Sequence, residues 1–414
     1  MKKRIRIFLL IAFVFTAVTV SYAVGLSRKE KDDMYQELEL FSDVISLIQS
    51  KYVENKTPQD LIYGSLKGLL SSLDPYSQFL SPDDYKELLV DTRGKFGGLG
   101  IEISLKDSIL TVISPLEGTP AWRAGIEAGD RIVKIENELT RGITLTEAVK
   151  KLRGAPGTEV KLTILREKEN RVFDVTIKRE IIKIKDIPKE TLLNNSIGYV
   201  KLSEFRENTA VELGKALSKL EKQGAKAYIL DLRNNPGGLL DSAVDVSSFF
   251  IEPQKLVVYT SNREGKKTEY KSLKSGKHIT DVPMVVLVNG GSASASEIVS
   301  GCLQAYRRAV IVGTHTFGKA CVQTIIPLFD GSAMRLTTSK YYTPDGKIIQ
   351  HKGIIPDIRV EQKEVKPDIS VEDKTFKKVE EKTSGKEDDN FYKNDYQLVR
   401  AVDLAKGLVI LSRK

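Results

Sequence analysis

The sequence contains little cysteine and little histidine, and this scarcity narrows the kinds of site that it can build. Two cysteines, Cys302 and Cys321, are too few for a disulfide framework or a cysteine zinc site. The histidines number three, His278, His315 and His351. We therefore expect neither a metal nor a cofactor, and a histidine-dependent catalytic site has few candidate residues.

A strong excess of charge of one sign is also missing. The formal net charge is +9, and four of the positive residues lie within the first six positions, which leaves +5 for the rest of the chain. So small an excess is not the signature of a nucleic-acid-binding protein, and we expect no nucleic acid partner. With 414 residues, 41% hydrophobic and 29% charged, the chain has the composition of a globular protein of two or three domains.

An uncharged run follows the cationic start, from Ile7 to Leu26. Its length of about twenty residues is close to what spans a bilayer. The positive flank would keep the amino terminus inside and export the rest of the chain. Because Ser21-Tyr22-Ala23 would serve as a cleavage site, residues 1–26 are predicted to be either a signal peptide or an uncleaved membrane anchor.

Apolar residues at helical spacing predict a helical N-terminal region over residues 32–92. In the first helix they are Phe41, Val44, Ile45, Ile48 and Tyr52. Thr57-Pro58 supplies a cap and a first-turn proline for the second helix. These paired helices are expected either to pack as core or to form a dimer contact.

The rest of the chain divides by composition and pattern. Residues 93–182 alternate short strands with two short helices, one of which begins with the capping box Thr144-x-x-Glu147. From 190 to 360 strands alternate with helices, which predicts a mostly parallel sheet with helical crossovers. Residues 361–394 are highly charged and predict a solvated or flexible linker. A last helix that returns to the body is predicted within 395–414.

A glycine-rich turn from Phe96 to Ile101 runs directly into a strand. Successive backbone N–H groups of such a turn converge on an anion, and a peptide carboxylate would fit there. The candidate ligands are Gly98, Leu99, Gly100 and Ile101. The strand that follows would pair with an extended peptide, and a helix at 144–152 would form the other wall of a groove. A plain turn is the alternative interpretation.

A serine-rich turn lies between an apolar strand and a helix. Asn289 to Glu297 follows the strand Met284 to Val288, and a strand, a tight turn and a helix are the arrangement that exposes a nucleophile at a helix N-terminus. The candidate nucleophiles are Ser292, Ser294 and Ser296. The alternative is that these serines only cap the helix.

A serine nucleophile needs a base, and a lysine among small residues is a candidate. Lys319 stands between Gly318 and Ala320 at the start of an apolar strand. To act as a base it must be neutral, and burial beside apolar walls lowers the pKa of a lysine. Gln323 would then orient the amine. A histidine triad that uses His315 is the alternative for the base.

Acyl transfer also needs donors for the developing oxyanion. The N–H of Ala295, which follows the candidate nucleophile, is the first candidate. The loop Asn234 to Gly238 ends the apolar strand Ala227 to Leu232, and the N–H of Gly237 or Gly238 would supply the second. These residues leave open which glycine donates, and a purely structural turn is the alternative.

Longer motifs resemble one family closely. GGSASASEIVSG, TFGKACVQTIIPL, LDLRNNPGGLL, LTTSKYYTPDG and GIIPDI are similar to the carboxyl-terminal processing proteases, PDZ-containing serine peptidases of family S41. Ahead of these motifs, GLGI and TPAWRAGIEAGDRIVKIE resemble a PDZ domain. The resemblance implies an α+β multidomain fold. Its parts are a helical N-terminal region, a PDZ domain as a small β-barrel with two helices, and a crotonase-like α/β catalytic core.

The resemblance also implies roles for single residues. Ser294 is the nucleophile, Lys319 the base and Gln323 the supporting residue, while the two neighbouring serines are structural. Ala320 and Cys321 stand where family members more often carry glycine and serine. Both replacements are small, so we expect the Ser/Lys dyad to persist.

The implied function is that of an exported serine endopeptidase of the bacterial periplasm or cell envelope, anchored in the inner membrane if the first segment is retained. It would recognise exposed C-terminal tails through its PDZ domain, cleave envelope proteins, form a homodimer and accept an adaptor lipoprotein. Gating by the PDZ domain through Arg166 is a further hypothesis, with an ordinary solvated arginine as the alternative. The main alternative is a noncatalytic PDZ adaptor or chaperone with a protease-like body.

Overall fold

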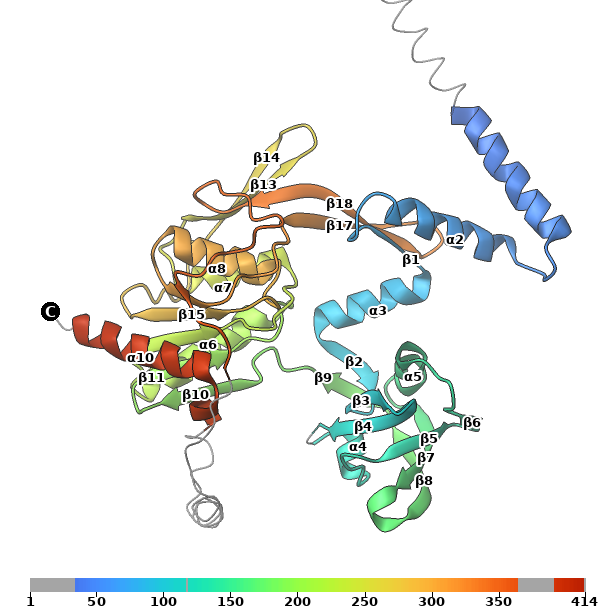
Figure 1. The fold of residues 1–414 in the computed structure, drawn as a ribbon, viewed down its shortest axis with the longest axis horizontal. Helices are drawn as coiled ribbons and strands as arrows, with labels where there is room; N and C mark the ends of the chain where they lie inside the picture. The colour runs from blue at the N-terminus through green and yellow to red at the C-terminus, as the bar shows by residue number, and fades with distance from the viewer. Residues whose placement is uncertain (1–33, 117, 364–390, 413–414) are drawn as a thin grey trace, which may run out of the picture. The chain divides into compact units, whose positions relative to one another are not determined.

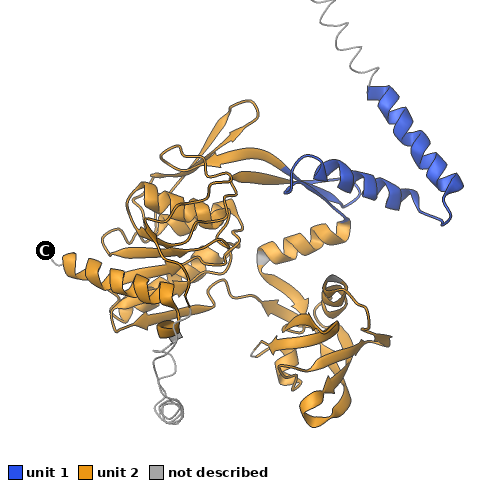
Figure 2. Cartoon of the chain, viewed as in Figure 1, with its two compact units in different colours: residues 1–81, 326–336 blue, residues 82–325, 337–414 orange. Residues whose placement is uncertain are grey.

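The computed structural model describes residues 34–116, 118–363 and 391–412. The predicted signal peptide or anchor at 1–26 and most of the predicted linker at 361–394 lie outside these residues. Within the described ranges, no helix has both the length and the apolar composition needed to span a membrane. The chain divides into two compact units, which are described separately (Figure 2).

Unit 1 comprises residues 1–81 and 326–336. Its described elements are a helix over residues 34–51, α2 (Pro58–Ser71), β1 (Gln78–Leu80) and the first residues of β18 (Ala333–Tyr342). The expected cap of α2 is confirmed, because Thr57 accepts a hydrogen bond from the Asp60 N–H at 3.1 Å and Pro58 occupies the first turn. β1 pairs antiparallel with β18, and the Tyr63 ring packs on Phe79 at 4.8 Å between centroids.

Unit 2 begins with α3 and the segment predicted to be a PDZ domain (Figure 1). The elements are α3 (Pro82–Arg93), β2 (Lys95–Gly98), β3 (Ile101–Lys106), β4 (Ile109–Pro115), α4 (Pro120–Arg123), β5 (Arg131–Ile135), β6 (Glu138–Leu139), α5 (Leu145–Leu152), β7 (Glu159–Arg166), η1 (Glu167–Glu169), β8 (Arg171–Lys178) and β9 (Glu180–Lys183). The main sheet has the order β3-β4-β5-β7-β8, and β2 pairs with β9. Apolar side chains from both helices and the sheet form one core, and the predicted capping box of Thr144 and Glu147 is confirmed.

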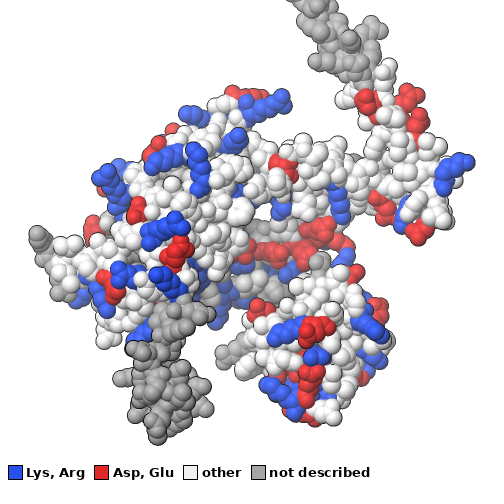
Figure 3. Space-filling view, in the orientation of Figure 1, with Lys and Arg blue, Asp and Glu red and all other residues white. Residues whose placement is uncertain are grey.

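Ion pairs join α3 to α5 along one face of α3. Asp83 lies 2.7 Å from the Lys150 ammonium, and Arg153 lies 2.9 Å from Glu87 and 3.3 Å from Asp91. Acidic side chains accordingly gather in the region of α3 in Figure 3. The Arg153 guanidinium also lies over a phenyl ring of β2, that of Phe96, at 4.4 Å from its centroid. These contacts are mostly solvent-exposed, so each contributes about 1 kcal/mol or less to stability.

The second part of unit 2 is a six-stranded sheet covered on both faces (Figure 1). Its strands, in spatial order, are β10 (Lys189–Leu193), β11 (Ile197–Lys201), β12 (Ala227–Asp231), β15 (Met284–Val288), β16 (Val310–Gly313) and β19 (Ile358–Arg359). All neighbours pair in parallel except β10 with β11. Every residue of β12 and β15 is buried, as expected for parallel strands with helices on both sides.

Two apolar clusters fill the space on the two faces of this sheet. The helices are α6 (Thr209–Lys222), α7 (Leu240–Ser248), α8 (Ala295–Ala305) and α10 (Tyr396–Leu411), the last preceded by η3 (Phe391–Asn394). Residues of α6, α7 and α8 pack on one face, which includes Leu230 and Val286. Residues of α10 pack on the other face, which includes Ile229 and Val285. The helices and sheets confirm the predicted α+β class.

A smaller antiparallel sheet completes unit 2. It contains β13 (Leu256–Asn262), β14 (Lys267–Lys271), β17 (Cys321–Pro327) and the last residues of β18. β17 begins two residues after Lys319. Tyr341, on β18, lies in the same region, because the Tyr341 N–H donates to the Ala320 carbonyl at 3.0 Å. This sheet therefore supports the segment that contains the candidate base.

Candidate active site

Ser294 lies at the N-terminus of α8, directly after the turn that follows β15. Its backbone has φ of 53° and ψ of −113°, a conformation that a residue other than glycine rarely adopts. Such strain persists only where the surroundings enforce it, and it clusters at functional positions. The turn thus presents the Ser294 side chain, which is partly exposed, beside the first amide groups of the helix.

Burial separates the three candidate serines. The Ser292 hydroxyl donates to the Leu232 carbonyl at 2.8 Å and is fully buried. The Ser296 hydroxyl is equally buried and donates to the Asn235 carbonyl at 2.9 Å. Both hydroxyls therefore join the serine turn to the loop after β12. Ser294 is the one of the three whose side chain keeps access to solvent.

A buried carboxylate joins the backbone of Ser294 to that of Lys319. Glu297 Oε2 accepts the Ser294 N–H and the Lys319 N–H, each at 2.9 Å. The two amide nitrogens therefore lie at most twice that distance apart. Glu297 Oε1 accepts the Gly318 N–H at 2.7 Å and the Thr316 hydroxyl. Burial raises the pKa of Glu297, and these four donors partly offset the rise.

The Tyr341 hydroxyl supplies a second link between the same two residues. It lies 3.2 Å from the carbonyl oxygen of Ser294 and also contacts the carbonyl oxygen of Lys319. Tyr341 is 1% exposed, so this link is shielded from water. Residues 294 and 319 are thus brought together from separate elements, with the Lys319 side chain partly buried. These contacts join the backbones of the two residues, and proton transfer between their side chains stays a prediction.

The glycine loop after β12 lies against the serine turn. A Cβ on Gly237 would stand 2.7 Å from the Ser294 Cβ and 2.9 Å from the Ala295 nitrogen. The Gly237 N–H itself donates to the Asn235 side chain at 2.9 Å. In the described chain the Gly238 N–H has no hydrogen-bond acceptor. Phe205 holds the loop on both sides of Gly238, because its N–H donates to the Gly237 carbonyl and its carbonyl accepts the Leu239 N–H. Ala295 and Gly238 are therefore the better candidates for oxyanion donors.

The remaining candidates have other contacts. Gln323 Nε2 donates to the Cys321 carbonyl at 3.3 Å and to the Thr337 hydroxyl at 3.4 Å, so its role toward Lys319 stays a prediction. No disulfide joins Cys302 to Cys321. Cys302 is fully buried, and burial raises the pKa of its thiol to about 12, which disfavours it as a nucleophile. The Cys321 thiol lies 3.3 Å from the Gln350 side chain.

The described contacts of the histidine side chains do not include Ser294. His278 Nδ1 lies 3.0 Å from the Ile251 carbonyl oxygen, and His351 Nε2 lies 3.3 Å from the Gln350 side-chain nitrogen. His315 is solvent-exposed. These positions favour Lys319 over His315 as the base.

The predicted carboxylate loop directly precedes β3. The carbonyl groups of Leu99 and Gly100 accept from Ala121 at 3.0 Å and Leu116 at 2.8 Å. Because C=O and the next N–H point in opposite directions in a trans peptide, the N–H groups of Gly100 and Ile101 point away from these partners. Leu99 is 2% exposed, so its side chain belongs to the core and only its backbone is suited to a ligand.

The predicted peptide site has a terminal strand, β3, on one side and the helix α5 on the other. β3 is the terminal strand of its sheet, and α5 contacts it. The C-terminal end of α5 lies beside the carboxylate loop, because the Gly154 N–H donates to the Gly97 carbonyl at 3.0 Å. An extended peptide that pairs with β3 would place its carboxylate at this end.

Comparison with known proteins agrees with this geometry. Residues 196–360 match peptidase family S41, residues 111–166 match a PDZ domain, and residues 15–83 match the N-terminal domain of the activating protease CtpB. A carboxy-terminal-processing protease of Bartonella bacilliformis is 41% identical over 86% of this chain and 82% of its own length. The chain belongs to the carboxyl-terminal processing proteases of family S41.

Two further relatives extend the comparison. The carboxy-terminal processing protease CtpA of Bacillus subtilis is 36% identical over 87% of this chain and 78% of its own. A solved structure from Bacteroides fragilis, described as an S41 protease, covers 88% of this chain and 97% of its own at 17% identity, with a TM-score of 0.52. The latter supports the fold alone. The predicted family and the PDZ domain are confirmed.

Two residues of this processing protease's site were missed in the sequence. Glu297 follows Ser294 by three positions, the spacing of a capping box, and that pattern was a usable signal. Tyr341 had no comparable signal, because its contact depends on the pairing of β17 with β18 and on the turn before β17.

Proposed function

We propose that this processing protease cleaves peptide bonds with Ser294 as nucleophile and Lys319 as general base. The neutral amine takes the hydroxyl proton while Oγ attacks the scissile carbonyl carbon. The tetrahedral oxyanion accepts hydrogen bonds from the N–H groups of Ala295 and Gly238. The lysine then gives the proton to the leaving amine, and water hydrolyses the acyl-enzyme by the same route.

One observation carries this proposal. Glu297 and Tyr341, both nearly inaccessible to water, each contact the backbone of Ser294 and of Lys319. The bond between Glu297 and the Ser294 N–H is that of a helix capping box, but the contacts of Glu297 and Tyr341 with Lys319 join this turn to a segment outside α8. Fixed backbones support the proposed dyad, because a shift of about 1 Å between reacting groups costs about a hundredfold in rate.

The substrates we propose are proteins with exposed C-terminal tails, bound in the groove between β3 and α5. The outward N–H groups of Gly100 and Ile101 would receive the tail carboxylate, and the free edge of β3 would pair with the residues before it. The uncharged run in residues 1–26 favours a location in the cell envelope, with envelope proteins as targets. Exposed apolar residues on the helix over 34–51, among them Leu38 and Leu47, favour a homodimer.

Cleavage of an unstructured protein tests the dyad directly. Ser294→Ala and Lys319→Ala are each expected to lower kcat at least about a thousandfold, because neither residue has a substitute in the site. Lys347→Ala, which removes a 74% exposed lysine side chain, is the control and should cleave as wild type. Product formation followed by gel and mass spectrometry is the measurement.

The same assay separates the alternatives. Intact substrate with every protein, wild type included, would favour the noncatalytic adaptor. If His315→Ala lost activity and Lys319→Ala kept it, His315 and not Lys319 would be the general base. A lysine base also predicts a rate that rises with pH as the amine loses its proton.

A further inference from the structure

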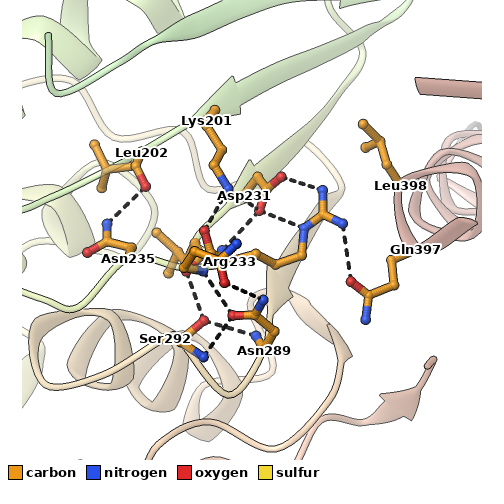
Figure 4. Close-up of polar contacts among 12 residues, drawn as sticks. Lys201, Leu202, Asp231, Arg233, Asn235, Asn289, Ser292, Gln397 and Leu398 are labelled. Atoms are coloured by element: carbon orange, nitrogen blue, oxygen red, sulfur yellow. Dashed lines mark hydrogen bonds and ion pairs between the residues drawn. The ribbon is translucent and has the colours of Figure 1, made fainter. Parts of the chain in front are cut away.

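The C-terminal helix begins in direct contact with the strand that leads to the glycine loop. Asp395, the N-cap of α10, forms a two-point ion pair with Arg233, at 2.8 Å to Nη1 and 2.7 Å to Nη2. Gln397 accepts from the same Nη1 at 3.1 Å (Figure 4). These two partners of Arg233 thus lie at the start of a helix that is 162 or more residues further along the chain.

Arg233 is held on its other side by the end of β12. Its Nε and Nη2 donate to the two oxygens of Asp231, at 3.0 and 2.6 Å, and Lys201 and Tyr199 add contacts to the same carboxylate at 3.3 and 2.9 Å. Asp231 is fully buried and Arg233 is 9% exposed. Two cations, Lys201 and Arg233, meet two anions, Asp231 and Asp395, so the cluster is neutral only while Asp395 carries its charge.

The residues that follow Arg233 are tied to the serine turn. The Asn234 N–H donates to the Asn289 side chain at 2.9 Å, and Asn289 returns a hydrogen bond to the Asn234 side chain at 2.9 Å. The Asn235 carbonyl accepts the Ala293 N–H at 3.0 Å. Figure 4 shows Arg233 between Asp231 and Gln397, with Asn289 and Ser292 beside it. A shift of Arg233 would therefore act on the serine turn through Asn234 and Asn289, and on Gly238 along the chain.

We propose that Asp395, with Gln397, is a positioning residue for hydrolysis: the first turn of the C-terminal helix fixes Arg233 and, through it, the loop that supplies an oxyanion donor. The proposal rests on the proposed role of Gly238. The bidentate pair has the geometry that fixes a guanidinium in orientation as well as in distance. Because Arg233 directly precedes the loop Asn234 to Gly238, the backbone passes the orientation of Arg233 on to this loop.

The Asp395→Asn variant separates this role from helix capping. Asn is as good an N-cap as Asp, so the hydrogen bond now made by the Leu398 N–H at 3.1 Å is kept while the charge is lost. We expect kcat on a tail-bearing peptide to fall about thirtyfold, with KM changed less than about twofold. Asp403→Asn, on the same helix and in an exposed pair with Arg400, is the control and should match wild type.

An inhibitor pair gives a readout that loss of stability alone would not produce. A peptide aldehyde forms a tetrahedral oxyanion on the serine, whereas the matching peptide acid does not. Asp395→Asn is expected to weaken the aldehyde about thirtyfold and to leave the acid unchanged. Asp395→Asn/Gln397→Glu returns a carboxylate to Arg233 Nη1 and should recover part of the aldehyde affinity.

The outcomes distinguish this inference from the proposed function. An aldehyde that wild type does not bind would contradict the Ser294 mechanism itself. Equal weakening of aldehyde and acid, or a wild-type kcat in Asp395→Asn, would overturn the positioning role while leaving the dyad intact. If Asp395→Asn does not fold, Asp395→Glu, which keeps the charge and shifts the carboxylate by one methylene, should show the same split between the two inhibitors.

Discussion

Glu297→Gln is expected to lower kcat about a hundredfold or more while the protein stays folded. The carboxylate accepts four hydrogen bonds, two of them from the Ser294 and Lys319 N–H groups. A glutamine amide has one acceptor oxygen, and its NH₂ group would face at least one of the backbone N–H donors in either orientation. If the NH₂ group takes the Oε2 side, it faces the Ser294 and Lys319 N–H groups, and the shared link between the proposed nucleophile and base is lost. Kinetics on a peptide substrate is the measurement.

Stability should respond differently from activity in this variant. An unsatisfied buried donor costs about 1–3 kcal/mol, but the variant also removes the cost of burying a charge, so the free energy of unfolding should change by about 2 kcal/mol or less. Asp60→Asn makes the same acid-to-amide change in the exposed capping box of α2 and should leave kcat unchanged. A Glu297→Gln enzyme with wild-type kcat would contradict the role of the shared carboxylate.

The raised pKa of Glu297 also predicts a pH dependence of stability. Since burial raises this pKa above its unfolded value, the native state binds a proton at a pH where the unfolded chain does not. The group's contribution to stability is therefore full below the ordinary glutamate pKa and is lost as pH rises through the raised value. As pH rises from the ordinary glutamate pKa through the raised value, the Tm of the wild type should therefore fall relative to the Tm of Glu297→Gln.

Gly237→Ala is expected to abolish most activity, with kcat lowered about a hundredfold or more. The added methyl would lie 2.7 Å from the Ser294 Cβ and 2.9 Å from the Ala295 nitrogen, so it would push the nucleophile and cover an oxyanion donor. The φ of +106° at this position adds backbone strain of about 1–3 kcal/mol. Steady-state kinetics and thermal unfolding together measure both effects.

A substitution at a second glycine distinguishes the effect of backbone strain from the effect of the methyl group's contact with Ser294. Gly224 has a similar φ of +92°, and a Cβ there would meet no atom within 4 Å. Gly224→Ala should therefore lose stability without losing kcat. If Gly237→Ala kept more than a tenth of wild-type kcat, the close approach of this loop to Ser294 would not matter for the reaction.

Local signals in the sequence predicted much of the fold. The capping patterns at Thr57 and Thr144 placed the starts of α2 and α5, and the buried apolar runs placed β12 and β15 within a residue. The pairing of β1 with β18 was not foreseen, because it joins segments about 250 residues apart, whose register depends on tertiary packing. The assignment of residues 326–336 to unit 1 follows from that pairing.

The candidate site was predictable in type but not in detail. Chemistry left three serines open, and only burial of the Ser292 and Ser296 hydroxyls separates them from Ser294. Chemistry also left Gly237 and Gly238 open, and the Asn235 side chain favours Gly238 because it accepts the Gly237 N–H. Such distinctions depend on which way a single group points, which residue type and spacing do not encode.

Trapping the acyl-enzyme tests the central claim most directly. The protein is mixed with an activated peptide ester, quenched in acid within milliseconds, digested and sequenced by tandem mass spectrometry. The account predicts an acyl group on Ser294 in the wild type and none in Lys319→Ala at the same time point. An acyl group on Ser292, Ser296 or Cys321, or undiminished acylation in Lys319→Ala, would contradict it.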